Sequence, residues 1–155
     1  MTQIHPTITI TRDQDPEATA RILASLPSWF GIPEANAHYE QAAAEKASYL
    51  AVRDGQTIGV ALVDRHFPET AEIHLIAVHA EQRGSGAGAA LIAALEADAR
   101  ADGARLLEVK TTGASFDDPG YAETRAFYAA QGFLRLEEFQ QLDWDGPTVI
   151  LVKPL

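Results

Sequence analysis

The sequence predicts a mixed α/β domain in which a central parallel β-α-β unit lies within a mostly antiparallel sheet. Three observations support this fold class. Apolar residues alternate along short β-rich runs, helical segments separate some of these runs, and a glycine-rich turn joins one run to a helix. The 155 residues are enough for one domain, which we expect to cover residues 1–155.

Residue patterns in the first half of the chain predict one strand, two helices and a hairpin. Polar and apolar side chains alternate over residues 7–11, which is typical of a half-buried strand. Helix-start residues and apolar spacing predict helices over 15–26 and 33–47. Two β-rich runs, residues 49–53 and 57–63, flank Asp54 and Gly55, a dipeptide that favours a tight antiparallel turn.

The second half predicts strands and helices in alternation, followed by a final pair of strands. Glycines end both predicted helices, and turn-rich segments separate the strands. The expected elements are a strand at 71–79, a helix ending at Asp102-Gly103, a strand at 105–111, a helix at 121–131, and strands at 133–142 and 148–153.

Composition excludes several classes of protein. The chain has no cysteine, which excludes disulfide scaffolds, thiolate zinc sites and a cysteine nucleophile. Its formal charge of −10 disfavours nucleic acid and anionic membranes as partners, and it either attracts cationic molecules or simply keeps the protein soluble. The sequence shows neither a signal peptide nor a bilayer-spanning apolar run, so we expect a cytoplasmic protein.

A glycine-rich turn between a predicted strand and a predicted helix is the strongest chemical signal. Glycines let the backbone approach an anion closely, and the N–H groups and positive dipole end of the following helix face the same point. An arginine adds positive charge, so the turn predicts a phosphate or pyrophosphate site. Its residues are Arg83, Gly84, Ser85, Gly86, Ala87 and Gly88.

Two kinds of cofactor fit such a turn. Gly84, Gly86 and Ala89 match a dinucleotide fingerprint, and Glu108 lies about 20 residues further on, where a ribose-binding acid is expected. A dinucleotide fold normally begins with this turn, however, whereas here a hairpin precedes it and little chain follows. A triphosphate-binding loop is excluded because no Gly-Lys-Ser/Thr follows the glycines.

Read as Arg83-x-x-Gly86-x-Gly88 after an apolar strand, the turn resembles the acetyl-CoA pyrophosphate motif of the GCN5-related N-acetyltransferase (GNAT) family. Residues 124–133 are similar to a later signature of that family, a helix with Phe-Tyr followed by Gly-Phe. The order of predicted elements matches the family from Ile8 to the C-terminus. The resemblance implies a single-domain GNAT-like fold whose sheet is splayed at the acetyl-CoA site.

The same resemblance implies how acetyl-CoA is held. In the family, a backbone N–H of the strand before the turn binds the thioester carbonyl and then the oxyanion. A tyrosine at the position of Tyr128 protonates the departing thiolate, although a tyrosine that only packs over the helix would look the same in sequence. The expected contacts outside the turn are Ile76, Ala77, Val78, Thr124, Phe127 and Tyr128.

Helical spacing sorts the last predicted helix into two faces. One face is a polar stripe that we expect to line the cofactor, and the other carries apolar residues that can face inward. The polar stripe is Tyr121, Thr124, Arg125 and Tyr128, and the inward set is Ala126, Phe127 and Ala130.

An amine nucleophile arrives mostly protonated, so a base must remove a proton directly or through water. Glu72 resembles the position where histone acetyltransferases of the family carry their catalytic glutamate. His74 shares its strand face by the two-residue period and is the rival base. The alternative is that Glu72 is a solubilising charge and His74 a packed core residue.

The five histidines raise the question of a metal site. His74 and His79 fall on opposite faces of a strand, and the sequence contains no HExxH motif or carboxylate cluster, so we expect no metal. Trp29 and Phe30 lie in the loop where the family often builds its acceptor site. We expect them to contact the acceptor with Glu72 and His74, with plain core packing as the alternative.

Together these observations favour an acetyl-CoA-dependent N-acetyltransferase. It would act on a small cationic amine or a peptide amine by direct transfer in a ternary complex, because the chain offers no cysteine nucleophile and no obvious serine nucleophile. The alternatives are a CoA-binding module of the same fold without transfer activity and, less favoured, a nucleotide-binding oxidoreductase. A homodimer is a candidate assembly because dimers are common among soluble oligomers.

Overall fold

The computed structural model describes residues 7–155, and its order of elements is the predicted one with a short 3-10 helix added. Residues 1–6, where the sequence lacks a signal-peptide pattern, lie outside the described residues. The elements are β1 (Thr9–Thr11), α1 (Pro16–Ala24), α2 (Pro33–Glu45), β2 (Ala47–Arg53), β3 (Gln56–Phe67), β4 (Thr70–Val78), η1 (Ala80–Gln82), α3 (Ala87–Ala101), β5 (Leu106–Thr112), α4 (Pro119–Ala130), β6 (Leu134–Gln140) and β7 (Pro147–Pro154).

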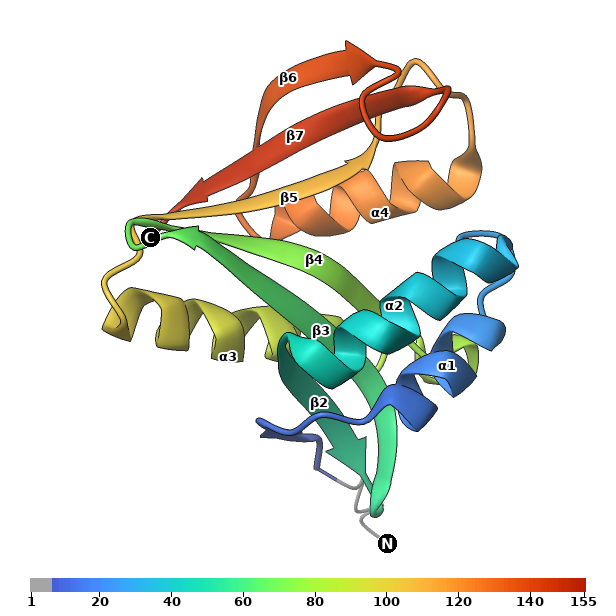
Figure 1. Cartoon of the computed structure of the whole chain (residues 1–155), viewed down its shortest axis with the longest axis vertical. Coiled ribbons are helices and arrows are strands. Elements are labelled where there is room, and N and C mark those ends of the chain that lie inside the picture. Colours follow the sequence, from blue (N-terminus) through green and yellow to red (C-terminus); the bar gives the residue numbers. More distant parts are fainter. Residues whose placement is uncertain (1–6) are drawn as a thin grey trace, which may run out of the picture. The chain divides into compact units, whose positions relative to one another are not determined.

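The strands form one hydrogen-bonded sheet in the order β1-β2-β3-β4-β5-β7-β6 (Figure 1). The pairs β1–β2, β2–β3, β5–β7 and β6–β7 are antiparallel, and β4–β5 is parallel. This confirms the predicted mixed sheet with a central parallel β-α-β unit. The parallel register joins Thr70–Ile73 to Leu106–Val109. The expected separation of the two strands beyond that stretch stays a prediction.

The chain folds into two compact units. Unit 1 comprises the described residues up to Val63 together with Leu75–Leu95, and unit 2 comprises Asp64–His74 and Glu96–Leu155. Among residues 7–155, no helix combines the length and the apolar character needed to cross a membrane. The expectation that residues 1–155 form a single domain stays a prediction.

Unit 1 is built around a hairpin and two short helices. The β2–β3 turn is the predicted one, because Asp54 and Gly55 both have positive φ, at 52° and 73°. On one face of this hairpin, α1 and α2 bury their apolar side chains against β2, β3 and the end of β4. The buried members of this core are Ile22, Leu23, Leu26, Ala42, Ala43, Leu50, Val60, Leu62, Leu75 and Ala77.

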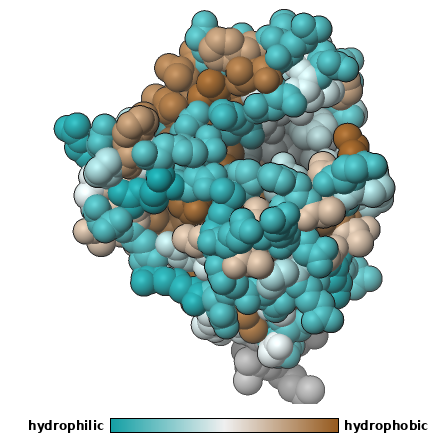
Figure 2. Space-filling model, viewed as in Figure 1, coloured by the Kyte–Doolittle hydropathy of each residue, from teal (hydrophilic) through white to brown (hydrophobic). Residues whose placement is uncertain are grey.

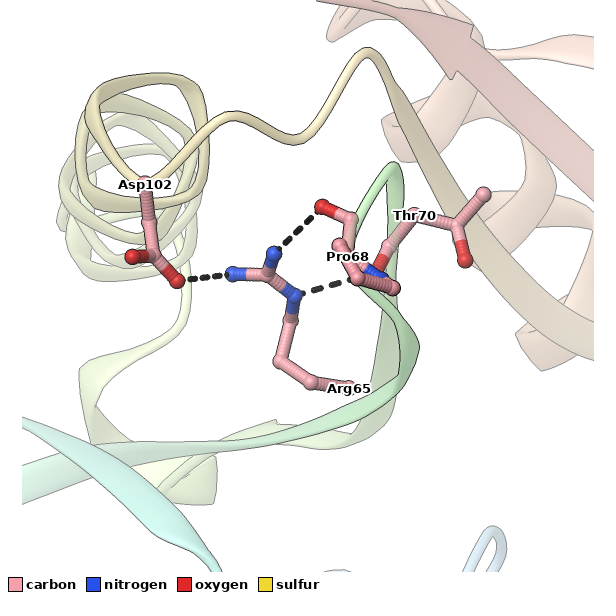
Figure 3. A network of polar contacts seen from close by, with 4 residues as sticks. All are labelled: Arg65, Pro68, Thr70 and Asp102. Atoms are coloured by element: carbon pink, nitrogen blue, oxygen red, sulfur yellow. Dashed lines mark hydrogen bonds and ion pairs between the residues drawn. The ribbon is translucent and has the colours of Figure 1, made fainter.

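In unit 2, Arg65 fixes the turn that joins β3 to β4 (Figure 3). Its Nε donates to the Thr70 carbonyl at 3.0 Å and its Nη2 to the Pro68 carbonyl at 2.7 Å. Its Nη1 lies 2.6 Å from Asp102 Oδ2, at the end of α3. One guanidinium therefore holds both carbonyls of a tight turn and the residue that follows a helix.

Strand β6 forms an edge of the sheet and exposes apolar side chains. Leu134 and Leu136 are 60% and 64% exposed, and the β6–β7 register shifts between Arg135 and Glu137. Figure 2 shows hydrophobic atoms gathered near the top of the view, where Figure 1 places β6 and β7. The predicted strand at 133–142 thus forms, but its side chains contribute little to the core.

Candidate functional site

The glycine turn of unit 1 has the backbone geometry that its sequence predicts. It follows η1 and leads directly into α3, and Gly84 and Gly86 have positive φ values of 77° and 89°. A Cβ added at either glycine would meet no heavy atom within 4 Å. The backbone at both glycines therefore borders open space, as close approach of a ligand requires.

The start of α3 directs backbone N–H groups at the same region. The first bond of the helix runs from Ala90 N to Gly86 O at 3.0 Å, and Ser85 Oγ accepts from Ala87 N at 3.3 Å. The first N–H groups of a helix have no acceptor within the helix, and the dipole is positive there. This arrangement can bind a phosphate oxygen through the backbone alone.

Side chains from elsewhere in unit 1 support this turn. Arg83 Cζ lies 4.5 Å from the ring centroid of Trp29, a cation–π contact between the turn and the loop after α1. Ala80 N donates to Ser25 Oγ at 3.0 Å. The turn and the η1 segment that precedes it each contact the α1 region. The Arg83–Trp29 contact could not be predicted from the sequence, because stacking between distant residues leaves no periodic pattern.

Trp29 and Phe30, the loop residues expected at the acceptor site, pack against the core of unit 1. Both are half-buried, and Phe30 meets Tyr39 edge to face at 5.9 Å. Core packing is therefore observed for both, and their contact with an acceptor stays a prediction. The backbone role of Ile76, Ala77 and Val78 also stays a prediction. Of these three, Ala77 is buried in the core while Ile76 and Val78 are half-buried.

In unit 2, Glu72 lies at the centre of a polar cluster. It is 8% exposed, and its carboxylate lies 3.5 Å from His66 Nε2 and 3.6 Å from Lys110 Nζ. A carboxylate so well buried is maintained by the charges around it. The reading of Glu72 as a solubilising surface charge is therefore wrong.

His74 contributes to the same cluster from the same strand. Its Nδ1 lies 3.5 Å from Asp64 Oδ2, so Glu72 and His74 both face residues of β3 that are two positions apart. This confirms the prediction that Glu72 and His74 share one face of the strand. Because β3 extends to Phe67, it supplies Asp64 and His66, which the sequence-based strand at 57–63 did not include.

The absence of a carboxylate cluster, inferred from sequence, is wrong for the folded chain. Asp64, His66 and Glu72 offer atoms within 4.8 Å of one another, a spacing that could hold a cation. Lys110 already brings a positive charge to the same carboxylate of Glu72. We therefore treat these residues as an ion-pair cluster and assign no metal ligands among them. The expectation that the protein binds no metal stays a prediction.

Glu108 faces Glu72 across the parallel strand pair. The two residues are partners in the β4–β5 register, so their side chains project from the same face of the sheet. Burial and the charge of Glu72 raise the pKa of Glu108 above its usual range, while Lys110 and His66 act in the opposite direction. Sequence reasoning singled out Glu108 as a candidate ribose-binding acid, and the structure places it beside the candidate base instead.

Helix α4 begins at Pro119 because Asp118 caps it, accepting from Gly120 N at 2.8 Å and from Tyr121 N at 3.2 Å. Its inward face differs from the expected one. Two of the residues expected inside, Ala126 and Ala130, are exposed, whereas Tyr128 is only 4% exposed.

Aromatic contacts explain why Tyr128 is buried. Its ring centroid lies 5.5 Å from that of Phe127 and 5.5 Å from that of Phe133. Arg125 of the predicted polar stripe donates to the Thr112 carbonyl at 2.8 Å, which ties α4 to β5. Thr124 is half-buried and donates to the Gly120 carbonyl at 3.1 Å. The polar stripe is therefore the covered face of α4 within unit 2.

Comparison with known proteins decides the family. The model of the acetyltransferase (GNAT) family matches residues 15–133, which include the glycine turn and the whole of the second motif. The chain belongs to the GNAT family. A search of curated proteins finds no match to the chain.

Solved GNAT structures share the fold over nearly the whole chain. A protein assigned to the GNAT acetyltransferases from Desulfovibrio desulfuricans has a TM-score of 0.84 at 24% identity, covering 96% of this chain and 99% of its own. A GNAT acetyltransferase from Elizabethkingia anophelis, solved with acetyl-CoA bound, has a TM-score of 0.70 at 19% identity, covering 96% and 98%. The ribosomal-protein-S18-alanine N-acetyltransferase of Escherichia coli has a TM-score of 0.73 at 17% identity, covering 96% and 94%.

Membership of the GNAT family decides between the two cofactor classes that the turn alone left open. The family match runs through Gly84, Gly86 and Ala89, so the dinucleotide fingerprint there is part of a GNAT motif. The similarity to the family that was noted from sequence is confirmed, and so is the fold class. GNAT membership indicates acyl-CoA-dependent acetyltransferase chemistry.

Proposed function

We propose that this GNAT protein transfers the acetyl group of acetyl-CoA to the amine of a small cationic acceptor, or to a peptide amine, by direct attack in a ternary complex. The observation that carries the proposal is the positive-φ glycine turn at the start of α3, within a chain that matches the family model. A chain without cysteine has no thiol for a covalent acetyl intermediate, which favours direct attack.

The proposal assigns the pyrophosphate of acetyl-CoA to the glycine turn. Backbone N–H groups at residues 84–88 would bind its oxygens, and Arg83 would supply the charge that a chain of net charge −10 needs there. The open space at the Cβ positions of Gly84 and Gly86 supports this assignment, because a side chain at either position would occupy the room that the ligand needs.

The chemical step then follows from the remaining predicted residues. The acceptor nitrogen attacks the thioester carbonyl, whose oxygen a backbone N–H of Ile76, Ala77 or Val78 stabilises. Attack needs the neutral amine, so Glu72 first takes a proton from the ammonium group through a water molecule; the C–S bond then breaks, and the nitrogen loses its second proton to solvent as the amide forms. Tyr128 donates a proton to the CoA thiolate. His74 is the alternative base, since its Nδ1 faces Asp64 in the same cluster.

The charge of the polar cluster supports a cationic acceptor. Asp64, Glu72 and Glu108 bring three carboxyl groups to one region, against the single formal charge of Lys110. An excess of carboxylates attracts an ammonium group and disfavours an anionic acceptor.

The proposed function is tested first by binding and then by transfer. In calorimetry we expect acetyl-CoA to bind and NAD(H) and NADP(H) not to bind. A screen of amino acids, polyamines, aminoglycosides and peptides, with CoA release as the readout, then identifies the acceptor class. Binding of acetyl-CoA with no release for any amine would favour the CoA-binding module instead.

Variants at the proposed catalytic residues complete this test. With an active acceptor, Glu72→Gln and Tyr128→Phe should each lower kcat/KM about a hundredfold, the usual contribution of a general acid or base. Glu137→Gln, on the exposed strand β6, is the matched control and should keep the wild-type rate. If His74 is the base, His74→Ala removes a pH dependence near 6 to 7 while Glu72→Gln does not.

A further inference from the structure

Glu72 and Glu108 bring two carboxyl groups side by side, where two ionised carboxylates repel each other. They are register partners on adjacent parallel strands, so their side chains project side by side from the same face of the sheet. A proton held between two adjacent carboxyl groups removes their repulsion, because the protonated group donates a hydrogen bond and the ionised group accepts it. Glu72 is 8% exposed, which leaves little water to screen a second charge.

Two basic side chains border the carboxylate of Glu72. His66 Nε2 and Lys110 Nζ both lie beside the carboxylate of Glu72, at 3.5 Å and 3.6 Å. The titratable groups that face the pair are Asp64 and His66 from β3, His74 from β4 and Lys110 from β5.

We propose that Glu72 and Glu108 form a carboxyl pair that shares one proton, and that Glu108 acts through Glu72 as a positioning residue for proton removal from the acceptor. The proposal rests on the proposed function for its catalytic part only. The shared proton itself requires no substrate, so it can be tested in the protein alone.

The proton balance of the step is simple. When both carboxyl groups are ionised, the ammonium N–H bond of the acceptor breaks and its proton binds the pair, directly or through water. The nitrogen keeps the electron pair with which it attacks the thioester. The proton is then held between Glu72 and Glu108 until it passes to solvent. Two coupled acids titrate as a pair, so the second carboxylate makes the first a stronger base.

The first experiment measures the melting temperature of the wild type and of Glu108→Gln from pH 4 to pH 8. The raised pKa of Glu108 means that the folded state binds more protons than the unfolded state above about pH 4.5. Wild-type stability therefore falls as pH rises through the window between the unfolded and folded pKa values. Glu108→Gln lacks this loss, so its melting temperature should match the wild type at pH 4 and exceed it by about 2 °C at pH 8.

Glu137→Gln is the control for this experiment, because Glu137 is exposed and lies on β6, outside the pair. It should show no gain that depends on pH. If Glu108→Gln gains no more than this control at any pH, the pair shares no proton and the inference is overturned. That result leaves acetyl transfer itself untouched.

The second experiment tests the positioning role by the pH profile of kcat/KM with one active amine. Glu108→Gln should move the acidic limb to lower pH and reduce the plateau about tenfold, because the remaining base is weaker. Lys110→Met should move the limb to higher pH, since Lys110 lowers the pKa of Glu108. Glu108→Asp, which restores a carboxyl group, should recover part of the shift.

Opposite shifts in these two variants distinguish coupling from general damage to the fold, which would lower the plateau without moving the limb. An acidic limb that stays at the wild-type pH in Glu108→Gln would overturn the positioning role, even if the stability experiment detects the shared proton. Failure to find any acceptor counts against the proposed function, whereas the stability experiment decides the pair independently.

Discussion

The glycine turn of unit 1 and the polar cluster of unit 2 are built in opposite ways. The turn is six consecutive residues, and its chemistry comes from backbone conformation and N–H direction. The cluster gathers side chains from β3, β4 and β5, and its chemistry comes from charge. A substitution in the turn should therefore disturb both ligand binding and the local fold, whereas one in the cluster should change chemistry and leave the fold intact.

The largest expected effect is that of Gly86→Val on acetyl-CoA binding. Valine at a φ of 89° is strained, and its side chain enters the open space beside the turn. We expect binding to weaken by about 3 kcal/mol, roughly a hundredfold in Kd, measured by calorimetry. Gly55→Val, at a positive φ in the β2–β3 turn, is the matched control, because it carries similar strain without touching the proposed site. Equal binding losses in both variants would contradict the assignment.

Arg83→Ala separates charge from backbone within the turn. Loss of the charge-assisted hydrogen bond should weaken acetyl-CoA binding by about 2 kcal/mol, roughly thirtyfold in Kd. Arg83→Lys keeps the charge but replaces the guanidinium that lies over Trp29, so its loss should be smaller. Arg100→Ala, near the end of α3, serves as the control for net charge. Unchanged affinity in Arg83→Ala would remove Arg83 from the site.

In the polar cluster, Glu72→Gln should change the free energy of unfolding at pH 7 by less than about 1 kcal/mol, measured by urea denaturation. The substitution removes the ion pair with Lys110 and alters the contact with His66, but it also removes the repulsion between Glu72 and Glu108, and these effects offset each other. A loss of several kcal/mol would mean that the cluster holds the fold together, and the contrast with the turn would fail.

The smallest expected effect is that of Asp102→Asn, which removes the ion pair with Arg65. Asp102 is 75% exposed, so solvent screens the pair strongly. We expect a loss of about 0.5 kcal/mol in the free energy of unfolding, which should shrink further in high salt. A loss that does not respond to salt would show that the contact acts through geometry and not through charge.

Much of the fold could be predicted because its signals are local. The sequence predicts a turn at Asp54-Gly55 and a helix end at Asp102-Gly103, and Asp54, Gly55 and Gly103 do adopt positive φ. Such backbone conformations depend mainly on neighbouring residues. The glycine turn was visible for the same reason. Each of these features is a statement about a few consecutive residues, which the sequence contains in full.

The polar cluster was not predictable because it depends on strand register. Nothing in the sequence aligns Glu72 with Glu108, which are paired only once β4 and β5 lie side by side. The end of β3 was also missed, since Asp64, Arg65 and His66 interrupt the apolar run. Arg65 holds turn carbonyls three and five residues further along the chain, a side-chain contact that strand propensity does not record.

The inward face of α4 was misjudged for a different reason. Helical spacing grouped Ala126 and Ala130 with Phe127, although exposing a methyl group costs very little. Tyr128 has far more apolar area to remove from water, and the rings of Phe127 and Phe133 receive it. The larger side chain therefore determines which way the helix faces.

The Arg65 contacts also bear on the order in which unit 2 folds. Two of them reach carbonyls only three and five residues away, while the third reaches Asp102, 37 residues along the chain. Hairpins close within microseconds, long before distant segments meet. We expect the β3–β4 hairpin to form in the folding transition state, so that Arg65→Ala slows folding, while Asp102→Asn mainly speeds unfolding. Asp64 and Glu72 would then face each other before β5 brings Glu108 to them.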